Sequence, residues 1–230
     1  MTREPLLVLV HGAWHRAPMW DALIAQLPGA DIATVQLPSS APASDSRLGD
    51  LHADARAIRA LVDEADQPVV VCAHSYGGAP ASQALDGAAH VKGIVYLNAF
   101  MLDVGESILS SVGGRYRPHW IVDERAGTVR IRDAESVLYG DLDPDAARQA
   151  AAGLGPQSLS SIRQPLTAAA WHHIPSTYIT AARDAGVPPA LSRGFSRRAG
   201  RTIVLDTAHS AFFSHPVELA RVLRDELRSA

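Results

Sequence analysis

Several residue types are scarce in this 230-residue sequence, and each shortage excludes a class of structure or partner. Cys72 is the only cysteine, so no disulfide can form within the chain. Lys92 is the only lysine and the net charge is −3, which leaves no polycationic surface for nucleic acid or anionic membranes. Apolar runs are short, and the first, residues 6–10, is shorter than a signal-peptide core or a membrane span. We therefore expect a cytoplasmic protein with neither nucleic acid nor a membrane as partner.

What the sequence does contain is typical of one globular unit. Hydrophobic residues make up 47% of the chain and charged residues 20%, and the length suits one sizeable core rather than two. The use of arginine in place of lysine, with abundant alanine, is typical of a high-GC bacterial genome.

The strongest local pattern is in residues 69–79, Val-Val-Val-Cys-Ala-His-Ser-Tyr-Gly-Gly-Ala. Its apolar start is typical of a strand buried on both faces of a parallel sheet, and residues 80–85 fit a helix with proline in its first turn. Between them Ser75 has the small residues Ala73 and Gly77 two positions away on either side. This is the pattern of a nucleophile elbow, in which a strained serine needs neighbours with almost no side chain. A plain glycine-rich turn is the alternative interpretation.

Apolar strands and amphipathic helices alternate at short range through most of the chain. The expected strands are residues 6–10, 32–35, 69–73, 91–97, 176–181 and 202–205. The expected helices are residues 19–27, 50–65, 80–85, 188–198 and 216–228, the last with Ser214 as its N-cap. This alternation predicts an α/β fold, a mostly parallel six-stranded sheet with helices on both faces.

The alternation breaks between residues 101 and 171. A hairpin across Ala126-Gly127 and four short helices are expected there, the helices at residues 134–139, 144–154, 158–162 and 166–171. We interpret residues 101–171 as a cap inserted over the carboxyl ends of the sheet, with residues 1–100 and 172–230 forming the core of a single structural domain. An irregular continuation of the core is the alternative.

A serine nucleophile needs a base, and the base needs an acid that orients it. In an open parallel sheet such groups meet at the carboxyl ends of the strands. His209 follows the last strand and is the candidate base; Asp184 follows the strand before it and is the candidate acid. Asp103 and Asp206 are the alternative acids, although Asp206 lies very close to His209 along the loop. No two of the ten histidines form the His-Glu-x-x-His motif of a zinc helix, so we expect no metal.

Acyl transfer also needs donors for the developing oxyanion. The backbone N–H of Tyr76, directly after the serine, is one candidate. The N–H of Ala13, in the His-Gly-Ala-Trp stretch that follows the first strand, is the other. For this stretch too, a plain turn is the alternative interpretation.

With these pieces assembled, the chain resembles the α/β-hydrolase superfamily over essentially its whole length. It is most similar to small bacterial esterases akin to plant methylesterases of the salicylate-binding protein type and to hydroxynitrile lyases. The matching motifs are Leu-Val-His-Gly-Ala-Trp-His at 9–15, Ala-His-Ser-Tyr-Gly-Gly at 73–78, Tyr-Leu-Asn-Ala-Phe at 96–100, Gly-Glu-Ser at 105–107, Pro-Ser-Thr-Tyr at 175–178, Ala-His-Ser at 208–210 and Ser-His-Pro at 214–216.

The resemblance implies an inserted cap, a serine triad, no cofactor and small hydrophobic esters as substrates. It also implies that His15 borders the substrate pocket. Four aromatic side chains are further candidate substrate contacts: Trp14, Tyr116, Trp120 and Tyr139. For the last three, which belong to the expected cap, packing of the cap against the core is the alternative interpretation. A homodimer is left open.

The chain departs from this group at three places. Residues 16–18, Arg-Ala-Pro, replace a more Gly- and Trp-like stretch, so the entrance of the pocket is expected to differ. Asn98 stands where many relatives carry an aspartate, which removes an alternative acid. Ser210 stands where hydroxynitrile lyases carry a lysine, which disfavours lyase activity on cyanohydrins.

The sequence therefore predicts a carboxylesterase-type hydrolase of EC class 3.1.1, working through an acyl-Ser75 intermediate. The same site would suit a lactone, a thioester or a carbon–carbon bond in a biosynthetic pathway, because the machinery is shared. A non-catalytic small-ligand-binding protein of the same fold is the third alternative.

Overall fold

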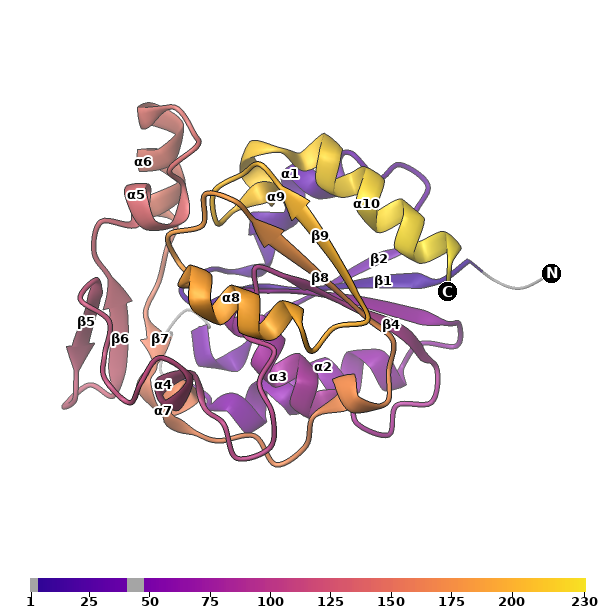
Figure 1. The fold of residues 1–230 in the computed structure, drawn as a ribbon, viewed down its shortest axis with the longest axis horizontal. Coiled ribbons are helices and arrows are strands. Elements are labelled where there is room, and N and C mark those ends of the chain that lie inside the picture. Colours follow the sequence, from indigo (N-terminus) through magenta and orange to yellow (C-terminus); the bar gives the residue numbers. More distant parts are fainter. Residues whose placement is uncertain (1–3, 41–47) are drawn as a thin grey trace.

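A six-stranded sheet forms the centre of the computed structural model, which describes residues 4–40 and 48–230 (Figure 1). Its strand order is β2 (Ile32–Val35), β1 (Leu6–Val10), β3 (Val69–His74), β4 (Val91–Leu97), β8 (Ser176–Ala181) and β9 (Arg201–Leu205). Every neighbouring pair in this sheet is parallel, which confirms the predicted architecture. The carboxyl ends of all six strands consequently meet at one edge.

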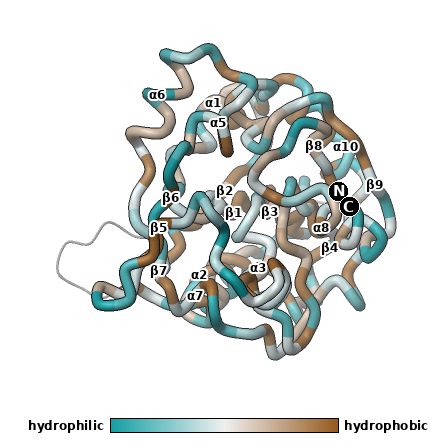
Figure 2. Tube along the Cα trace, turned by 60° about the vertical axis from the view of Figure 1, so that its left-hand side comes forward, coloured by the Kyte–Doolittle hydropathy of each residue, from teal (hydrophilic) through white to brown (hydrophobic). Residues whose placement is uncertain are grey.

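The two faces of the sheet are both apolar, because alternate residues of a strand point to opposite sides. In β1, Val8 and Val10 pack into the core on one face, while Leu7 and Leu9 pack into the core on the other. Cys72 of β3 is completely buried on the second face, as expected of a small hydrophobe. The hydropathy of the chain follows this arrangement, with hydrophobic residues concentrated along the central strands (Figure 2).

Helices cover both faces of the sheet (Figure 1). One face carries α2 (Leu51–Asp63), α3 (Gly78–Ala84) and α8 (Pro189–Ser196). The other carries α1 (Asp21–Ile24), α9 (Ala211–Ser214) and α10 (Pro216–Arg228). Single turns of 3₁₀ helix are η1 (Ala17–Trp20), η2 (Pro38–Ser40), η3 (Ser75–Gly77) and η4 (Ala170–His172).

Two predicted helix ends are wrong. The helix expected over residues 19–27 is the 3₁₀ turn η1 followed by the single turn α1. Pro28 disfavours α-helical geometry at Leu27, the last residue of the expected helix. Ser214 is not the N-cap of the last helix: it ends α9, and α10 begins at Pro216 after His215.

Much of the 101–171 segment lies beyond the carboxyl ends of β8 and β9 in Figure 1, whereas its last residues return past α3 to η4, before the start of β8. They contain α4 (Ile108–Ser111), β5 (Trp120–Asp123), β6 (Thr128–Ile131), α5 (Ala134–Leu138), α6 (Pro144–Ala152), β7 (Gln157–Ser158) and α7 (Leu159–Arg163). The predicted hairpin is confirmed, since β5 and β6 pair antiparallel, with Gly127 at a positive φ of 64° in the turn. The helix expected over 166–171 is wrong, because Leu166 instead pairs with Val104 in an isolated bridge.

The two longest helices, α2 and α10, have 13 residues each and are amphipathic. Neither they nor any other helix within residues 4–40 and 48–230 is long and apolar enough to cross a membrane. The cytoplasmic location stays a prediction.

Candidate active site

Ser75 lies where β3 ends and η3 begins, with its backbone in the left-handed region at φ 53°. A non-glycine residue there carries roughly 1–2 kcal/mol of strain, which the packing around it must offset. Two glycines allow the close approach of chain segments around this turn. A Cβ at Gly77 would lie 2.5 Å from the His11 carbonyl oxygen, and one at Gly12 would lie 3.0 Å from the Ser75 Cβ. The strained turn that the sequence predicts is therefore present.

His209 and Asp184 form a buried pair at the ends of β9 and β8. His209 Nδ1 lies 2.9 Å from Asp184 Oδ1, and only 2% and 5% of the two side chains are exposed. The same carboxylate oxygen accepts hydrogen bonds from the backbone N–H groups of Gly186 at 2.7 Å and Val187 at 3.1 Å. Because the carboxylate is held by its own loop, it fixes the orientation of the imidazole and leaves Nε2 for other partners.

The two alternative acids lie elsewhere. Asp103 Oδ1 is 2.9 Å from His172 Nε2. Asp206 Oδ1 is 3.0 Å from Arg183 Nε, and 86% of its side chain is exposed. Neither carboxylate is paired with His209, so the geometry favours Asp184.

The backbone of His209 is held by two side chains that sequence reasoning did not assign to the site. The amide of Asn98 donates to the His209 carbonyl oxygen at 2.9 Å and accepts from the Ala181 N–H at 2.6 Å. His74 Nε2 lies 3.2 Å from the same carbonyl oxygen. Burial lowers the pKa of His74 well below its ordinary value, so this ring is neutral. The position of Asn98 directly after β4 was the signal available in the sequence.

The loop after β1 carries Ala13 and Trp14 and is tied to the 101–171 segment. Trp14 has a positive φ of 65°. Its backbone N–H donates to Gln157 Oε1 at 3.3 Å, and its indole N–H donates to the Val129 carbonyl at 3.0 Å. The Gly155 N–H donates to the Trp14 carbonyl at 2.8 Å. The backbone at Ala13 is thus positioned by contacts far away in the sequence.

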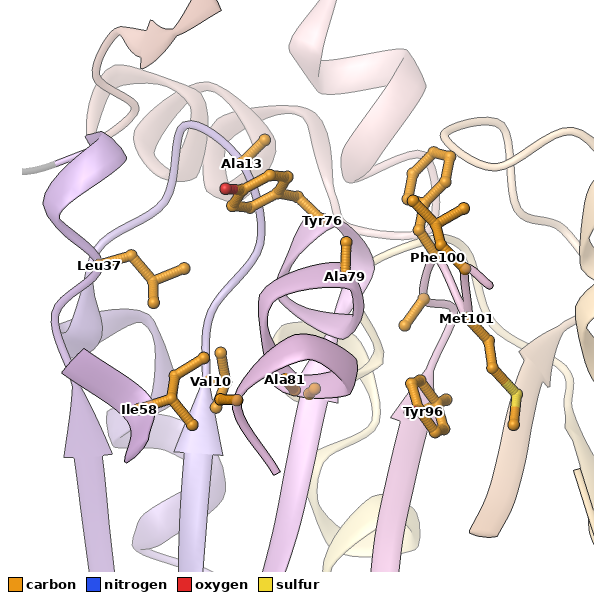
Figure 3. Packing of buried hydrophobic residues seen from close by; sticks show 14 of the residues in the cluster. Val10, Ala13, Leu37, Ile58, Tyr76, Ala79, Ala81, Tyr96, Phe100 and Met101 are labelled. Carbon is orange, nitrogen blue, oxygen red and sulfur yellow. The ribbon is translucent and has the colours of Figure 1, made fainter. Parts of the chain in front are cut away.

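A buried polar network lies beside Ser75, and its members other than Tyr76 were not predicted from the sequence. The Tyr76 hydroxyl donates to Asp54 Oδ2 at 2.6 Å, and the N–H of Ser39 donates to Asp54 Oδ1 at 2.8 Å. Gln157 Nε2 donates to the Ser39 hydroxyl at 2.7 Å. Figure 3 shows the Tyr76 ring near Ala13, with its hydroxyl directed away from Phe100. Burial raises the pKa of Asp54 to about 6.

Ser75, His209, Ala13 and Tyr76 line one cavity, which we call the Ser75 cavity. Its other walls are mostly apolar. They include Trp14, Phe100, Ile108, Trp120, Leu138 and Ile162. Its volume is about 30 Å³, which holds water but not an ester.

The predicted substrate contacts lie in different parts of the structure. Trp14 and Trp120 line the Ser75 cavity. Tyr116 does not: its hydroxyl contacts Glu124 and Arg163 instead. His15 and Tyr139 line a second, larger cavity that is described below.

A family model described as "Alpha/beta hydrolase family" matches residues 7–222. The chain belongs to the alpha/beta hydrolase family. The match includes all six strands of the central sheet except the first residue of β1, and it includes Ser75, Asp184 and His209.

This alpha/beta hydrolase is similar to several known proteins along nearly its whole length. It is 27% identical to alpha/beta hydrolase nvfD of Aspergillus novofumigatus, with 96% of each chain covered. It is 25% identical to the pyrethroid hydrolase of Sphingobium wenxiniae, covering 95% of this chain and 86% of that protein. The crystal structure of the methylesterase MES16 from Arabidopsis superposes with a TM-score of 0.82 at 22% identity, covering 98% of this chain and all of that one (100%). The similarity to the MES16 structure establishes the fold.

Proposed function

We propose that this alpha/beta hydrolase is a carboxylesterase of EC class 3.1.1 that cleaves a small apolar ester through an acyl-Ser75 intermediate. One observation carries the proposal. A serine at positive φ shares a cavity with an imidazole whose Nδ1 is hydrogen-bonded to a buried carboxylate. This arrangement of Ser75, His209 and Asp184 supports nucleophilic catalysis with a serine, its base and an orienting acid.

In the proposed reaction the Ser75 oxygen attacks the ester carbonyl carbon while its proton passes to His209 Nε2. Asp184 stabilises the imidazolium that results. The negative charge on the carbonyl oxygen is held by the backbone N–H groups of Ala13 and Tyr76. Collapse of this intermediate breaks the bond to the alcohol, which leaves with the proton from His209. Water then repeats the sequence on the acyl-serine and releases the acid.

We propose that residues 101–171 act as a cap over this site. Side chains from this segment, among them Ile108, Trp120 and Leu138, supply much of the apolar wall of the Ser75 cavity. The cavity of about 30 Å³ is too small for an ester, so substrate entry requires part of this segment to move. The apolar wall supports a hydrophobic acyl or alcohol group as the preferred substrate.

Two relatives support ester cleavage by their names, a pyrethroid hydrolase and a methylesterase. The same groups would also act on a lactone, a thioester or an activated carbon–carbon bond, because acyl transfer to serine is common to these reactions. The apolar wall favours none of these over a carboxylic ester, and the similarity to a pyrethroid hydrolase favours the ester.

The decisive experiment is hydrolysis of p-nitrophenyl esters from acetate to octanoate by the native protein and the Ser75→Ala variant. We expect turnover by the native protein and a loss in the variant on the order of 10⁴-fold or more. Ser229→Ala, at the exposed end of the chain, is the matched control and is expected to keep full activity. Turnover that persists in Ser75→Ala would overturn the serine assignment. No turnover by either protein would favour the ligand-binding alternative.

A further inference from the structure

A second cavity lies beside the Ser75 cavity, and we call it the Arg16 cavity. Its volume is about 620 Å³, within the range of small-molecule sites. It is bounded by the η1 turn, by α6 and by the last residues of α9. Its wall is mainly apolar, formed by Pro18, Met19, Leu142, Ala150, Leu154 and Phe213.

The rings of His15 and His74 lie between the Arg16 cavity and His209. His15 Nε2 accepts a hydrogen bond from the Tyr139 hydroxyl at 2.8 Å, and both residues line the Arg16 cavity. The His15 ring centroid is 5.8 Å from that of His74, which is 4.6 Å from that of His209. A molecule confined to the Arg16 cavity would therefore contact His15 and Tyr139 but not His209, which does not line this cavity.

Arg16 gives this apolar cavity its charge. Its Nε is buried and has no hydrogen-bond partner, and no Asp or Glu in residues 4–40 and 48–230 forms an ion pair with its guanidinium. A Cβ at Gly155 would lie 3.1 Å from Arg16 Nη2, so the guanidinium packs closely against this glycine. His15 adds no charge, because burial lowers its pKa to about 3. None of the residues that line the cavity is acidic.

An unpaired guanidinium in an apolar wall indicates what the cavity would bind. Leaving a buried N–H without a partner costs roughly 1–3 kcal/mol, and a carboxylate matches the planar fork of arginine with two parallel hydrogen bonds. The apolar wall at the same time favours a hydrophobic body over a small inorganic anion, which would leave that wall in contact with water.

We propose that the Arg16 cavity binds an amphipathic monocarboxylate, with the carboxylate on the Arg16 guanidinium and the apolar body against the wall. Two sources have this chemistry. One is the free carboxylate of a substrate that is the half-ester of a dicarboxylic acid, and the other is the acid that ester cleavage releases. The binding site rests on its own geometry, and only the choice between sources rests on the proposed function.

Calorimetric titration with octanoate and with the neutral octanamide tests the site without any turnover. For the native protein we expect octanoate to bind at least about tenfold more tightly than octanamide, since a charge-assisted hydrogen bond contributes that much. Arg16→Gln should abolish this difference. Arg221→Gln, which removes an exposed arginine on α10, should preserve it. Equal affinities for the two ligands, or an unchanged preference in Arg16→Gln, would overturn the proposal.

A cavity-filling variant distinguishes the Arg16 cavity from the Ser75 cavity as the place of binding. Ala150 lines only the former, so Ala150→Trp is expected to abolish octanoate binding while hydrolysis of p-nitrophenyl acetate continues. Octanoate binding that survives in a folded Ala150→Trp variant, with an unchanged unfolding temperature, would contradict the location.

Kinetics then separates the two sources. The native protein and Arg16→Gln are compared on p-nitrophenyl hydrogen glutarate, a half-ester, and on p-nitrophenyl butyrate. If the carboxylate belongs to the substrate, Arg16→Gln lowers kcat/KM about tenfold for the half-ester alone. If it belongs to the released acid, the variant treats both esters alike, and octanoate slows butyrate hydrolysis by the native protein but not by Arg16→Gln. Absence of turnover would remove the proposed function and leave the calorimetric result standing.

Discussion

The Tyr76 hydroxyl donates a 2.6 Å hydrogen bond to Asp54, a carboxyl group with no exposed surface. Tyr76 is the residue whose backbone N–H we propose as an oxyanion donor, so its side chain anchors the very peptide that would hold the charge. Asp54 also accepts from Ser39, and Ser39 accepts from Gln157, which in turn accepts from the Trp14 N–H. One buried network therefore connects both proposed donor segments.

Asp54 should make the stability of the protein depend on pH. Its pKa is about 6 in the folded protein, above its ordinary value of 3.8, because burial disfavours the charged form. The folded state thus binds the proton more tightly than the unfolded chain, and this stabilisation is complete below the unfolded value and lost as pH rises through about 6. The difference between the folded and unfolded pKa values of Asp54 corresponds to about 3 kcal/mol of unfolding free energy.

The test is urea unfolding of the native protein and of Asp54→Asn across this range. We expect the stability advantage of the native protein over Asp54→Asn to decrease by about 3 kcal/mol between about pH 3.5 and pH 7. Asp63→Asn, on the exposed side of the same helix, is the matched substitution at a carboxyl group that is not buried. A difference between native and Asp54→Asn that stays constant with pH would show that the carboxyl titrates normally.

Gln157 is predicted to act on catalysis from a distance, by holding the Trp14 N–H. Gln157→Leu removes this acceptor and the donor to Ser39, so the loop that carries the Ala13 N–H should become less well positioned. We expect kcat to fall by roughly 10- to 100-fold with little change in KM, somewhat less than the loss of an oxyanion donor itself.

Gln164→Leu is the matched control, because Gln164 also joins two segments through its amide, at Leu51 and Asp50, away from the Ser75 cavity. Gln164→Leu should lower the free energy of unfolding without a selective effect on kcat. Equal kinetic constants for Gln157→Leu and the native protein would exclude the positioning role.

The sequence predicted the parts of this site that depend on strand ends. Ser75, Asp184 and His209 each follow an apolar strand, and parallel strands bring such positions to one edge whatever the details of packing. Asp54 and Gln157 could not be found in this way. Asp54 is one polar residue on an amphipathic helix, and only the packed structure shows that it faces inward towards Tyr76.

Residues 101–171 were harder to predict for the same reason. The hairpin β5–β6 has local turn chemistry, with Gly127 in the left-handed region, and was predicted correctly. The two-residue strand β7 is formed only through its pairing with β6, and its second residue was predicted to begin a helix. The division of aromatic residues between two cavities likewise depends on tertiary contacts that no periodicity encodes.

Asn98 is predicted to hold the loop that carries His209, the proposed base, through the His209 carbonyl. Asn98→Asp keeps an acceptor for the Ala181 N–H but replaces the donor to His209 with a carboxylate oxygen that repels the carbonyl. We expect a loss of about 1–3 kcal/mol in unfolding free energy and a fall in kcat of about tenfold or more. Asn98→Ala removes both the donor to His209 and the acceptor for the Ala181 N–H but introduces no repulsion, so it should lose less activity. The reverse order would rule out the donor role.

Gly186 allows the imidazole of His209 to approach the loop that carries Asp184. A Cβ at Gly186 would lie 2.9 Å from His209 Cγ and Nδ1, closer than such contacts occur, so Gly186→Ala must displace the ring or the loop. Misplacement of a catalytic group by about 1 Å costs up to about 100-fold, and we expect kcat/KM for a p-nitrophenyl ester to fall at least about tenfold. Gly194→Ala is the control, since nothing lies within 4 Å of its Cβ position on α8. That variant should keep full activity and gain up to about 1 kcal/mol in helix stability. Activity in Gly186→Ala equal to that in Gly194→Ala would mean that the position of the imidazole does not limit the reaction.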